Sequence, residues 1–264
     1  MRAMVLDAIC RLEDNQSPLT PAELPVPAPG PGEVRLRVSV CGVCHTDLDE
    51  IEGRMPPPRL PVVLGHQVVG TVDALGPGAA ALQPGDRVGV AWIWSACGRC
   101  KYCLAGLENL CPEFRATGRD ANGGYAEFMT VPAAFAHPLP DGIPDVEAAP
   151  LLCAGAIGYR SLALSGLSDG QALGLTGFGA SAHLVLKMVR HRFPAARRAR
   201  IPRPRRRDPA APGGAALRSA GREPRPGGAQ GTADPRGEGG TGVTTPILSN
   251  AVRNSATVAS GTGP

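Results

Sequence analysis

Four cysteines crowded into one short stretch constrain the fold of this chain more than any other feature. They are Cys97, Cys100, Cys103 and Cys111, in the spacing C-x2-C-x2-C-x7-C. Four thiolates on a single loop complete a tetrahedral zinc site with no open position, which is typical of structural rather than catalytic zinc. An iron–sulfur cluster uses a related cysteine run, but usually with a different fourth spacing. The sequence therefore predicts a structural zinc ion bound by this loop.

The cysteines and the N-terminal sequence also indicate the compartment. All eight cysteines lie in the first 153 residues, and cysteines clustered at metal-ligand spacing favour zinc binding in a reducing cytosol over disulfide formation. Residues 1–12 lack a basic segment followed by an apolar core, so no secretory signal is expected. No apolar run approaches the roughly 20 residues that span a bilayer. We therefore expect a cytoplasmic protein.

A strand is predicted immediately before a second cysteine-containing segment. From Glu33 to Cys41, apolar and polar residues alternate with a period of two, the pattern of a half-buried strand. Gly42 permits a tight turn at its end, and a short helix is expected after Cys44. The pair Cys41-x-x-Cys44 could also be a redox pair or part of a small zinc site, but the thioredoxin-like βαβ context of cytosolic redox pairs is missing. Cys41 is expected to be a buried apolar thiol.

A glycine-rich turn near residue 180 has the pattern of a nucleotide-binding element. Residues 171–178 predict an apolar strand, and residues 181–191 predict a helix. Their junction contains Gly177-x-Gly179-x-x-Ala182, and such glycines let the backbone approach a pyrophosphate at the N-terminus of a helix. Because it follows a strand and opens a helix, this turn indicates the start of a Rossmann fold.

Several motifs together resemble the zinc-dependent medium-chain alcohol dehydrogenases. They are the four-cysteine loop, the glycine turn, and the runs Gly42-Val43-Cys44-His45-Thr46-Asp47, Gly65-His66-Gln67-Val68-Val69-Gly70 and Asn122-Gly123-Gly124-Tyr125-Ala126-Glu127-Phe128. The resemblance extends from the N-terminus to about Phe193. It implies a mixed α/β fold, in which a GroES-like, β-rich catalytic domain at residues 1–155 is followed by an incomplete Rossmann NAD(P)-binding domain at residues 156–194.

The resemblance implies a second, catalytic zinc ion. Its ligands would be Cys44, His66 and Cys153, the Cys2His set known from alcohol dehydrogenase, with the fourth position open to water or substrate. Residues 145–164 predict a helical region that presents Cys153. Asp47 would hold the ring of His66. Gln67 stands where the family most often has glutamate; it can still form hydrogen bonds, but it brings no negative charge toward the metal.

Other implied roles concern the substrate and the cofactor. Thr46 would hydrogen-bond the substrate oxygen and begin a proton relay that ends at Asp49 or directly at water. With an ordinary pKa of about 4, Asp49 suits neutral pH less well than the histidine that often stands there. Trp92 and Met55 would line the substrate pocket, and core packing is the alternative role for Trp92. Cofactor contacts are implied for His45, Gly177, Gly179 and Ala182.

The sequence departs from the family pattern after residue 194. Residues 195–264 carry a net charge of +8, against −4 for residues 1–194, and are rich in arginine, proline and glycine. They lack the second strand and the acidic residue that a dinucleotide fold needs about 20 positions after its glycines. Such a composition cannot bury a core, so a disordered tail is expected. A reading-frame shift is the favoured origin, and a basic arm for nucleic acid is the alternative.

The motifs predict an oxidoreductase. The implied reaction is the oxidation of an alcohol to an aldehyde or ketone, with hydride transfer to NAD or NADP and zinc as the Lewis acid. A zinc-dependent aldehyde reductase and a non-catalytic, zinc-binding GroES-like fragment with a basic tail are the alternatives. Because the cofactor domain is incomplete, we expect little or no activity from this chain. The expected partner is a small-molecule alcohol or aldehyde; the family suggests a homo-oligomer, an expectation weakened by the missing C-terminal pattern, and neither membrane nor nucleic acid is expected to bind.

Overall fold

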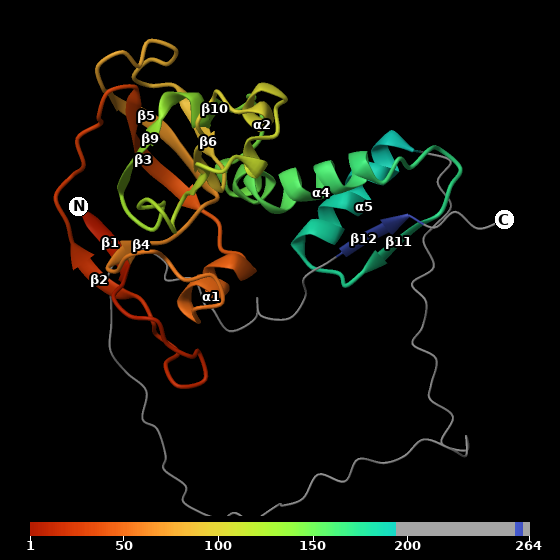
Figure 1. Cartoon of the computed structure of the whole chain (residues 1–264), viewed down its shortest axis with the longest axis horizontal. Helices are drawn as coiled ribbons and strands as arrows, with labels where there is room; N and C mark the ends of the chain where they lie inside the picture. The colour runs from red at the N-terminus through yellow and green to blue at the C-terminus, as the bar shows by residue number, and fades with distance from the viewer. Residues whose placement is uncertain (194–256, 261–264) are drawn as a thin grey trace, which may run out of the picture.

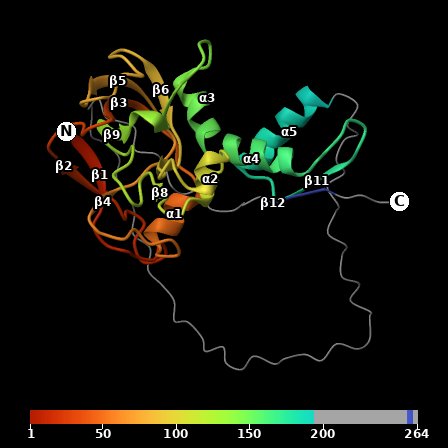
Figure 2. The same cartoon turned by 45° about the horizontal axis from the view of Figure 1, so that its top comes forward.

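The computed structural model describes residues 1–193 and 257–260. Figures 1 and 2 show a β-rich part, built from strands β1 to β10 and short helices, and beside it a smaller part that contains helices α4 and α5. Within the described residues, no helix combines the length and the apolar composition that crossing a membrane requires. The candidate metal ligands lie in the β-rich part and at its junction with the helices.

A five-stranded antiparallel sheet forms the centre of the β-rich part. Its order is β10-β6-β5-β3-β9, with the bounds Ala136–Pro138, Arg87–Val90, Val68–Leu75, Glu33–Cys41 and Phe128–Pro132. The strand predicted from alternation is confirmed as β3. Val34 and Leu36 of β3 are fully buried and pack with apolar side chains of β5, β6 and β9. Burial of this one face accounts for the period of two in the sequence.

A three-stranded sheet, β2-β1-β4, supports the first cysteine-containing segment. Its strands are β1 (Arg2–Leu6), β2 (Thr20–Glu23) and β4 (Val62–Val63), and helix α1 (His45–Ile51) packs against it. Leu6, Ile51 and Val62 share one fully buried cluster. This packing fixes α1, and with it Cys44 at the helix N-terminus, beside the segment that carries His66.

A small lobe carries the four-cysteine loop. It contains β7 (Ile93–Ser95), which pairs with β8 (Arg115–Ala116), helix α2 (Lys101–Leu104) and the 3-10 helix η1 (Glu108–Leu110). Among residues 93–116, which are all described, Cys111 and Ala116 alone are buried. A lobe with so small an apolar core needs another source of stability, such as a bound metal.

The predicted helical region at residues 145–164 is interrupted. It comprises α3 (Asp145–Ala148), the 3-10 helix η3 (Ala149–Leu152) and α4 (Ala154–Leu164), and it follows another 3-10 helix, η2 (Ala133–Phe135). The interruption falls at Cys153, whose φ of −127° and ψ of −78° lie outside the helical region. Pro150 lacks an N–H donor and disturbs the regular hydrogen-bond pattern just before this point. The break places Cys153 between two helical segments at the edge of the β-rich part.

The glycine turn lies between a short strand and a helix, as its sequence predicts. Strand β11 (Leu173–Thr176) lies within the strand expected at residues 171–178. Helix α5 (Ala180–Arg192) contains the helix expected at residues 181–191. Leu162 of α4, Leu173 of β11 and Val185 of α5 are buried together. The two helices and the strand therefore form one small packed unit.

One strand is described within the predicted tail. Strand β12 (Thr257–Ser260) pairs antiparallel with β11, so that Leu173 lies opposite Ser260. The composition of residues 195–264 did not predict this strand, because the pairing depends on backbone donors and acceptors that a distant strand leaves free. The rest of the predicted tail lies outside the described residues, and so do the reading-frame shift and the basic arm.

Gly76 stands where the backbone leaves no room for a side chain. A Cβ atom there would lie 1.9 Å from the carbonyl oxygen of Gly30 and 2.9 Å from that of Glu33. Because backbone atoms cannot move aside as a flexible side chain can, Gly76→Ala should lower the free energy of unfolding by about 3 kcal/mol in a denaturant titration. Gly174→Ala is the matched control, since a Cβ at Gly174 meets nothing within 4 Å. Equal effects of the two substitutions would contradict this expectation.

Asp145 ties the start of α3 to the five-stranded sheet. Its carboxylate accepts hydrogen bonds from Ser39 Oγ and from Arg87 Nε, the latter at 2.8 Å. The Ser39 hydroxyl and then Arg87 lower the pKa of Asp145. A lowered carboxyl pKa stabilises the fold above the unfolded value of about 4, and this contribution is lost as the pH falls through the folded pKa.

Asp145→Asn should therefore reduce the free energy of unfolding by about 1 kcal/mol at pH 7, a modest value because the site is partly exposed. The difference from the wild type should shrink as the pH falls below about 4. Urea unfolding at the two pH values measures both effects. Asp141→Asn, an exposed aspartate of the preceding loop, should change neither. A difference that grows at low pH would oppose this account.

Candidate metal centres

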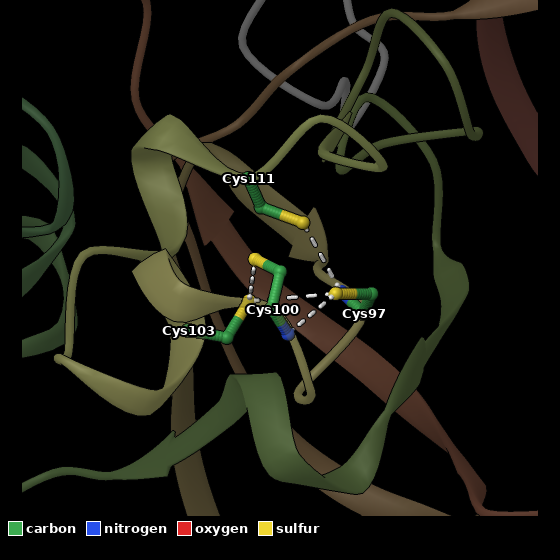
Figure 3. A group of neighbouring side chains, drawn as sticks. All are labelled: Cys97, Cys100, Cys103 and Cys111. Carbon is green, nitrogen blue, oxygen red and sulfur yellow. Dashed lines mark hydrogen bonds between the residues drawn. The ribbon is translucent and has the colours of Figure 1, made fainter.

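The four cysteines of the small lobe converge on one centre. Figure 3 shows the side chains of Cys97, Cys100, Cys103 and Cys111 directed toward one another from the loop after β7, from α2 and from the end of η1. The sulfur of Cys103 lies 3.9 Å from that of Cys97 and 3.6 Å from that of Cys100. Zinc–sulfur bonds of about 2.3 Å give tetrahedral edges of about 3.8 Å. The spacing therefore suits a four-thiolate zinc site.

Backbone N–H groups prepare this cluster for negative charge. Cys111 Sγ accepts from the N–H of Cys97 at 3.4 Å and from that of Glu113 at 3.3 Å, and Cys97 Sγ accepts from Cys100 at 3.4 Å. Backbone donors at Arg99 and Cys100 lower the pKa of Cys97 to about 6. Oriented donors of this kind stabilise the thiolate form, which is the form that binds metal.

A second group of ligand atoms comes from three distant segments. Cys44 is the N-cap residue of α1, His66 follows β4, and Cys153 lies between η3 and α4. The Sγ atom of Cys44 lies 3.1 Å from His66 Nε2 and 3.9 Å from Cys153 Sγ, and all three ligand atoms lie within 4.8 Å of one another. Tetrahedral zinc gives edges of about 3.8 Å between sulfurs and about 3.6 Å between sulfur and nitrogen. This donor set fits a zinc ion with one position left open.

Charge is shared unequally in this second group. The contact with Cys153 lowers the pKa of Cys44. Burial acts in the opposite direction, and the His66 ring lowers the pKa further. The contact between the two cysteines raises the pKa of Cys153. His66 is 1% exposed; burial lowers the pKa of its ring, but the neighbouring Asp47 carboxylate and Cys44 sulfur outweigh this effect and raise it. These directions favour a thiolate at Cys44 beside a protonated His66 ring, whose proton a bound metal would displace.

Asp47 links the N-terminus of α1 to His66. Its Oδ2 accepts the N–H of Cys44 at 2.8 Å in a capping box, and its Oδ1 lies 3.4 Å from His66 Nδ1. A carboxylate behind a ligand histidine fixes the ring tautomer and leaves Nε2 free for a metal. Both residues are buried, so this pair is shielded from water.

Two residues near this group were not assigned a role from the sequence. Glu50 is 2% exposed, and its carboxylate lies within 4.8 Å of the ligand atoms of Asp47 and His66. Burial, followed by the charge of Asp47, raises the pKa of Glu50 to about 8. Tyr125 has a buried hydroxyl beside the same cluster. Glu50 lies one helical turn after Asp47, so the spacing of the two acids on α1 was the signal for it.

Gln67 lies beside the metal-ligand segment with its amide packed against backbone. It is 2% exposed, and a Cβ at Gly42 would lie 3.0 Å from Gln67 Oε1. Its Nε2 is buried and has no hydrogen-bond partner among the described residues. The side chain thus fills the space next to the turn that precedes Cys44.

The candidate relay residues lie together on α1. The N–H of Thr46 is 3.4 Å from the sulfur of Cys44. Asp49 Oδ1 lies 3.6 Å from His45 Nε2 and 2.5 Å from Arg54 Nε. The structure therefore places the predicted relay acceptor Asp49 beside the predicted cofactor residue His45, and it pairs Asp49 with the guanidinium group of Arg54, for which no role was predicted from the sequence.

The predicted pocket residues and the glycine turn have other contacts. Trp92 packs against Phe114 with a centroid distance of 4.9 Å, and Met55 is 40% exposed. Neither observation places Trp92 or Met55 beside Cys44. In the predicted turn, Gly177 has a φ of +76°, Gly179 is the N-cap residue of α5, and Ala182 is fully buried. The backbone therefore has the form expected for a strand-to-helix turn.

Known proteins are similar in sequence to most of the described chain. Residues 30–141 match the family described as the alcohol dehydrogenase GroES-like domain. The probable alcohol dehydrogenase AdhA of Mycobacterium tuberculosis is 56% identical over 177 residues, which cover 65% of this chain and 51% of that protein. An alcohol dehydrogenase of Geobacillus stearothermophilus is 39% identical over 180 residues, covering 68% of this chain and 53% of that protein. The chain spans about half the length of these relatives.

Solved structures give the same result. An NAD-dependent alcohol dehydrogenase has a TM-score of 0.65 and 34% identity, covering 72% of this chain and 55% of that chain. A cobalt- and zinc-bound thermostable alcohol dehydrogenase from Pyrobaculum aerophilum has a TM-score of 0.65 and 28% identity, covering 72% and 56%. The five-stranded sheet, the four-cysteine group and the group of two cysteines and one histidine define a GroES-like domain with two candidate metal sites. Residues 30–141 are thus a GroES-like domain of the alcohol dehydrogenase type, and the chain is similar to zinc-type medium-chain alcohol dehydrogenases over about two thirds of its length.

Proposed function

We propose that the protein is by family a zinc-dependent alcohol dehydrogenase, an enzyme that oxidises an alcohol to an aldehyde or ketone with NAD or NADP as hydride acceptor. Because the sequence after residue 194 departs from the family pattern, we expect this chain itself to have little or no activity. The observation that supports this most strongly is the convergence of Cys44, His66 and Cys153, because three ligands leave a fourth position for substrate. The relatives and solved structures named above are alcohol dehydrogenases. Their agreement in family supports the same reaction class here.

Two zinc ions per chain are part of this proposal. Cys44, His66 and Cys153 would hold the catalytic ion, and the structural ion would be held by Cys97, Cys100, Cys103 and Cys111. When bound, the catalytic ion supplies Lewis-acid chemistry that lowers the pKa of the alcohol hydroxyl. The carboxylate of Asp47 lies 3.4 Å from His66 Nδ1, and a carboxylate behind a ligand histidine would make the ring a more basic ligand and fix its orientation.

Helix α1 supplies the groups that handle the substrate proton. The hydroxyl of Thr46 would hydrogen-bond the substrate oxygen at the first turn of the helix, beside Cys44. Asp49 would receive the proton one turn later, and His45 would face the cofactor pyrophosphate. Because His45 and Arg54 both contact the Asp49 carboxylate, direct release of the proton to water is the alternative route.

The cofactor would bind at the glycine turn. Residues 1–155 form the proposed catalytic domain, and residues 156–194 form the start of the proposed Rossmann domain, with Gly177, Gly179 and Ala182 at its pyrophosphate turn. The N-terminus of α5 offers unpaired backbone N–H groups to an anion. When bound, the nicotinamide accepts the hydride. NAD and NADP are equally compatible, since the acidic residue that discriminates between them belongs to a later strand.

A non-catalytic role is the second candidate. In this account the chain is a GroES-like domain that binds two zinc ions but no dinucleotide. The antiparallel pairing of β11 with β12 favours it, because a Rossmann sheet places a parallel strand beside its first strand. Metal content does not separate the two candidates, since both hold two zinc ions, whereas cofactor binding does.

Partners and compartment follow from the same proposal. The substrate would be a small alcohol or its aldehyde, with Trp92 and Met55 along the apolar side of the pocket. All eight cysteines are free thiols, which suits a reducing, cytoplasmic compartment. A homo-oligomer is consistent with the family, and nucleic acid is not a proposed partner.

Titration of the zinc-loaded full chain with NADH, followed by cofactor fluorescence, tests the proposed function. Saturable binding, together with NAD-dependent oxidation of a primary alcohol by the same preparation, is the result that supports a dehydrogenase. Gly179→Asp, which places a negative charge at the pyrophosphate turn, should weaken NADH binding by at least about 10-fold. Absence of NADH binding while both zinc ions remain bound would favour the non-catalytic candidate.

A further inference from the structure

Polar atoms without partners gather around the carboxylate of Asp47. Its Oδ2 accepts the N–H of Cys44, whereas Oδ1 is buried and has no hydrogen-bond partner among the described residues. The same is true of His66 Nδ1, which lies 3.4 Å from Oδ1, of Glu50 Oε2 and of the Tyr125 hydroxyl. Buried polar groups without partners cost free energy, so a concentration of four such atoms requires a physical explanation.

Backbone and ring contacts hold Tyr125 in this place. Its N–H donates to the carbonyl of Leu64 at 3.0 Å, and its carbonyl accepts from the N–H of Met4 at 2.8 Å. The ring occupies the space beside Gly65, where a Cβ atom would lie 2.7 Å from the ring. Gly65 also has a φ of +98°. The residue before His66 is therefore a glycine both for its backbone conformation and for the room that the Tyr125 ring needs.

The hydroxyl of Tyr125 complements the carboxylate of Asp47. Burial and then the negative charge of Asp47 raise the pKa of Tyr125, so the hydroxyl keeps its proton and remains a donor. A carboxylate oxygen has two lone pairs, so Asp47 Oδ1 can accept from both the Tyr125 hydroxyl and His66 Nδ1–H. Hydrogen bonds from the Tyr125 hydroxyl and from His66 Nδ1 to Asp47 Oδ1 would satisfy three of the four unpartnered atoms together.

We propose that Tyr125 is a positioning residue for His66 that acts through Asp47. Its hydroxyl donates to Asp47 Oδ1 and restricts the carboxylate to the orientation that faces His66 Nδ1, which directs Nε2 toward Cys44. The inference rests on the proposed metal site of Cys44, His66 and Cys153. Groups that orient a metal ligand from behind contribute about 10- to 100-fold to metal affinity.

Tyr125→Phe tests this role, because it removes the hydroxyl and keeps the ring beside Gly65. In a cobalt(II) titration of the full chain, followed by the absorption of thiolate-bound cobalt, the affinity of the Cys44 site should fall by about 10-fold or more. The four-cysteine site should keep its affinity and so report that the variant is folded. Tyr159→Phe is the matched control; Tyr159 is 59% exposed on α4, and its substitution should change neither affinity.

A double-mutant cycle with Asp47→Asn identifies the route of the effect. If Tyr125 acts through Asp47, Tyr125→Phe should have little further effect on cobalt affinity in the Asp47→Asn background. Unchanged affinity in Tyr125→Phe, or an equal loss in both backgrounds, would overturn the inference. So would a lower unfolding temperature without a loss of affinity, which indicates packing alone. A wild-type chain that binds cobalt only at the four-cysteine site would instead contradict the proposed metal site.

Discussion

Cys103→Ser should remove one metal ion per chain and unfold the small lobe at residues 93–116. The lobe buries few apolar side chains, namely Cys111 and Ala116, so its order depends on the tetrahedral site. Structural zinc contributes about 10–16 kcal/mol to the folding of small zinc-binding peptides. Even a third of that amount would lower the unfolding temperature of a domain of this size by about 10 °C.

The metal content of Cys103→Ser, measured by native mass spectrometry, and its thermal unfolding curve check this expectation. Cys10→Ser is the matched control, because Cys10 belongs to neither group of ligands. The control should keep two metal ions and the unfolding temperature of the wild type within a few degrees. A Cys103→Ser chain that still holds two metal ions, with the lobe protected from proteolysis, would show that the four cysteines do not form a metal site.

Cys44→Ser should remove the other metal ion and, with it, any alcohol oxidation by the chain. Cys44 lies at the centre of its group, in contact with both His66 Nε2 and Cys153 Sγ. The ligand of the metal is a thiolate, and a serine hydroxyl stays protonated at neutral pH. Serine therefore cannot replace Cys44 as a ligand. We expect the metal affinity of this site to fall by at least about 1,000-fold, equivalent to about 4 kcal/mol.

Cys41→Ser is the matched control for Cys44→Ser. Cys41 is three residues away, and its sulfur packs toward Gly65 and Gly124 rather than among the ligand atoms. Burial raises the pKa of Cys41, so its thiol remains neutral. The control should lose some stability but keep both metal ions. Loss of the second metal in Cys41→Ser, or its retention in Cys44→Ser, would contradict the assignment of ligands.

Local patterns predicted much of the fold. The alternation at residues 33–41 identified β3 because one face of that strand is buried against its neighbours. The glycine turn was found with its strand and helix because glycine conformation and helix initiation are local properties. The break at Cys153 could not be seen in the same way. It depends on how η3 is held against strands β5 and β6 while α4 packs on α5, and α-helical periodicity carries no such information.

In the candidate sites, too, local patterns were predicted from the sequence and long-range contacts were not. The four-cysteine cluster was evident because all its ligands lie on one loop. Cys44, His66 and Cys153 are far apart in the sequence, so their grouping came from the resemblance to a known family, and the structure brings them within 4.8 Å. Glu50 was missed although its spacing from Asp47 on α1 was a signal for it, whereas the role of Tyr125 becomes visible only when its turn meets the segments of Asp47 and His66.

Strand β12 shows the opposite limit of sequence analysis. Residues 257–260 lie in a region whose composition indicates no core, yet they pair with β11 through the backbone. Backbone pairing requires little from the side chains, so a composition-based prediction has no signal for it.

The contacts of Asp49 could not be predicted from its position in the sequence either. Its contacts with Arg54 and His45 compete with the relay role expected from that position alone.

Cobalt(II) substitution followed by addition of an alcohol tests most directly whether this chain holds one closed and one open metal site. The wild-type chain should bind two cobalt ions, one with the absorption of a four-thiolate site and one with that of a two-thiolate, one-imidazole site. Trifluoroethanol, an alcohol that resists oxidation, should shift the bands of the second ion and leave those of the first unchanged. Binding of a single cobalt ion, or two spectra that are both indifferent to the alcohol, would contradict the proposed catalytic zinc site.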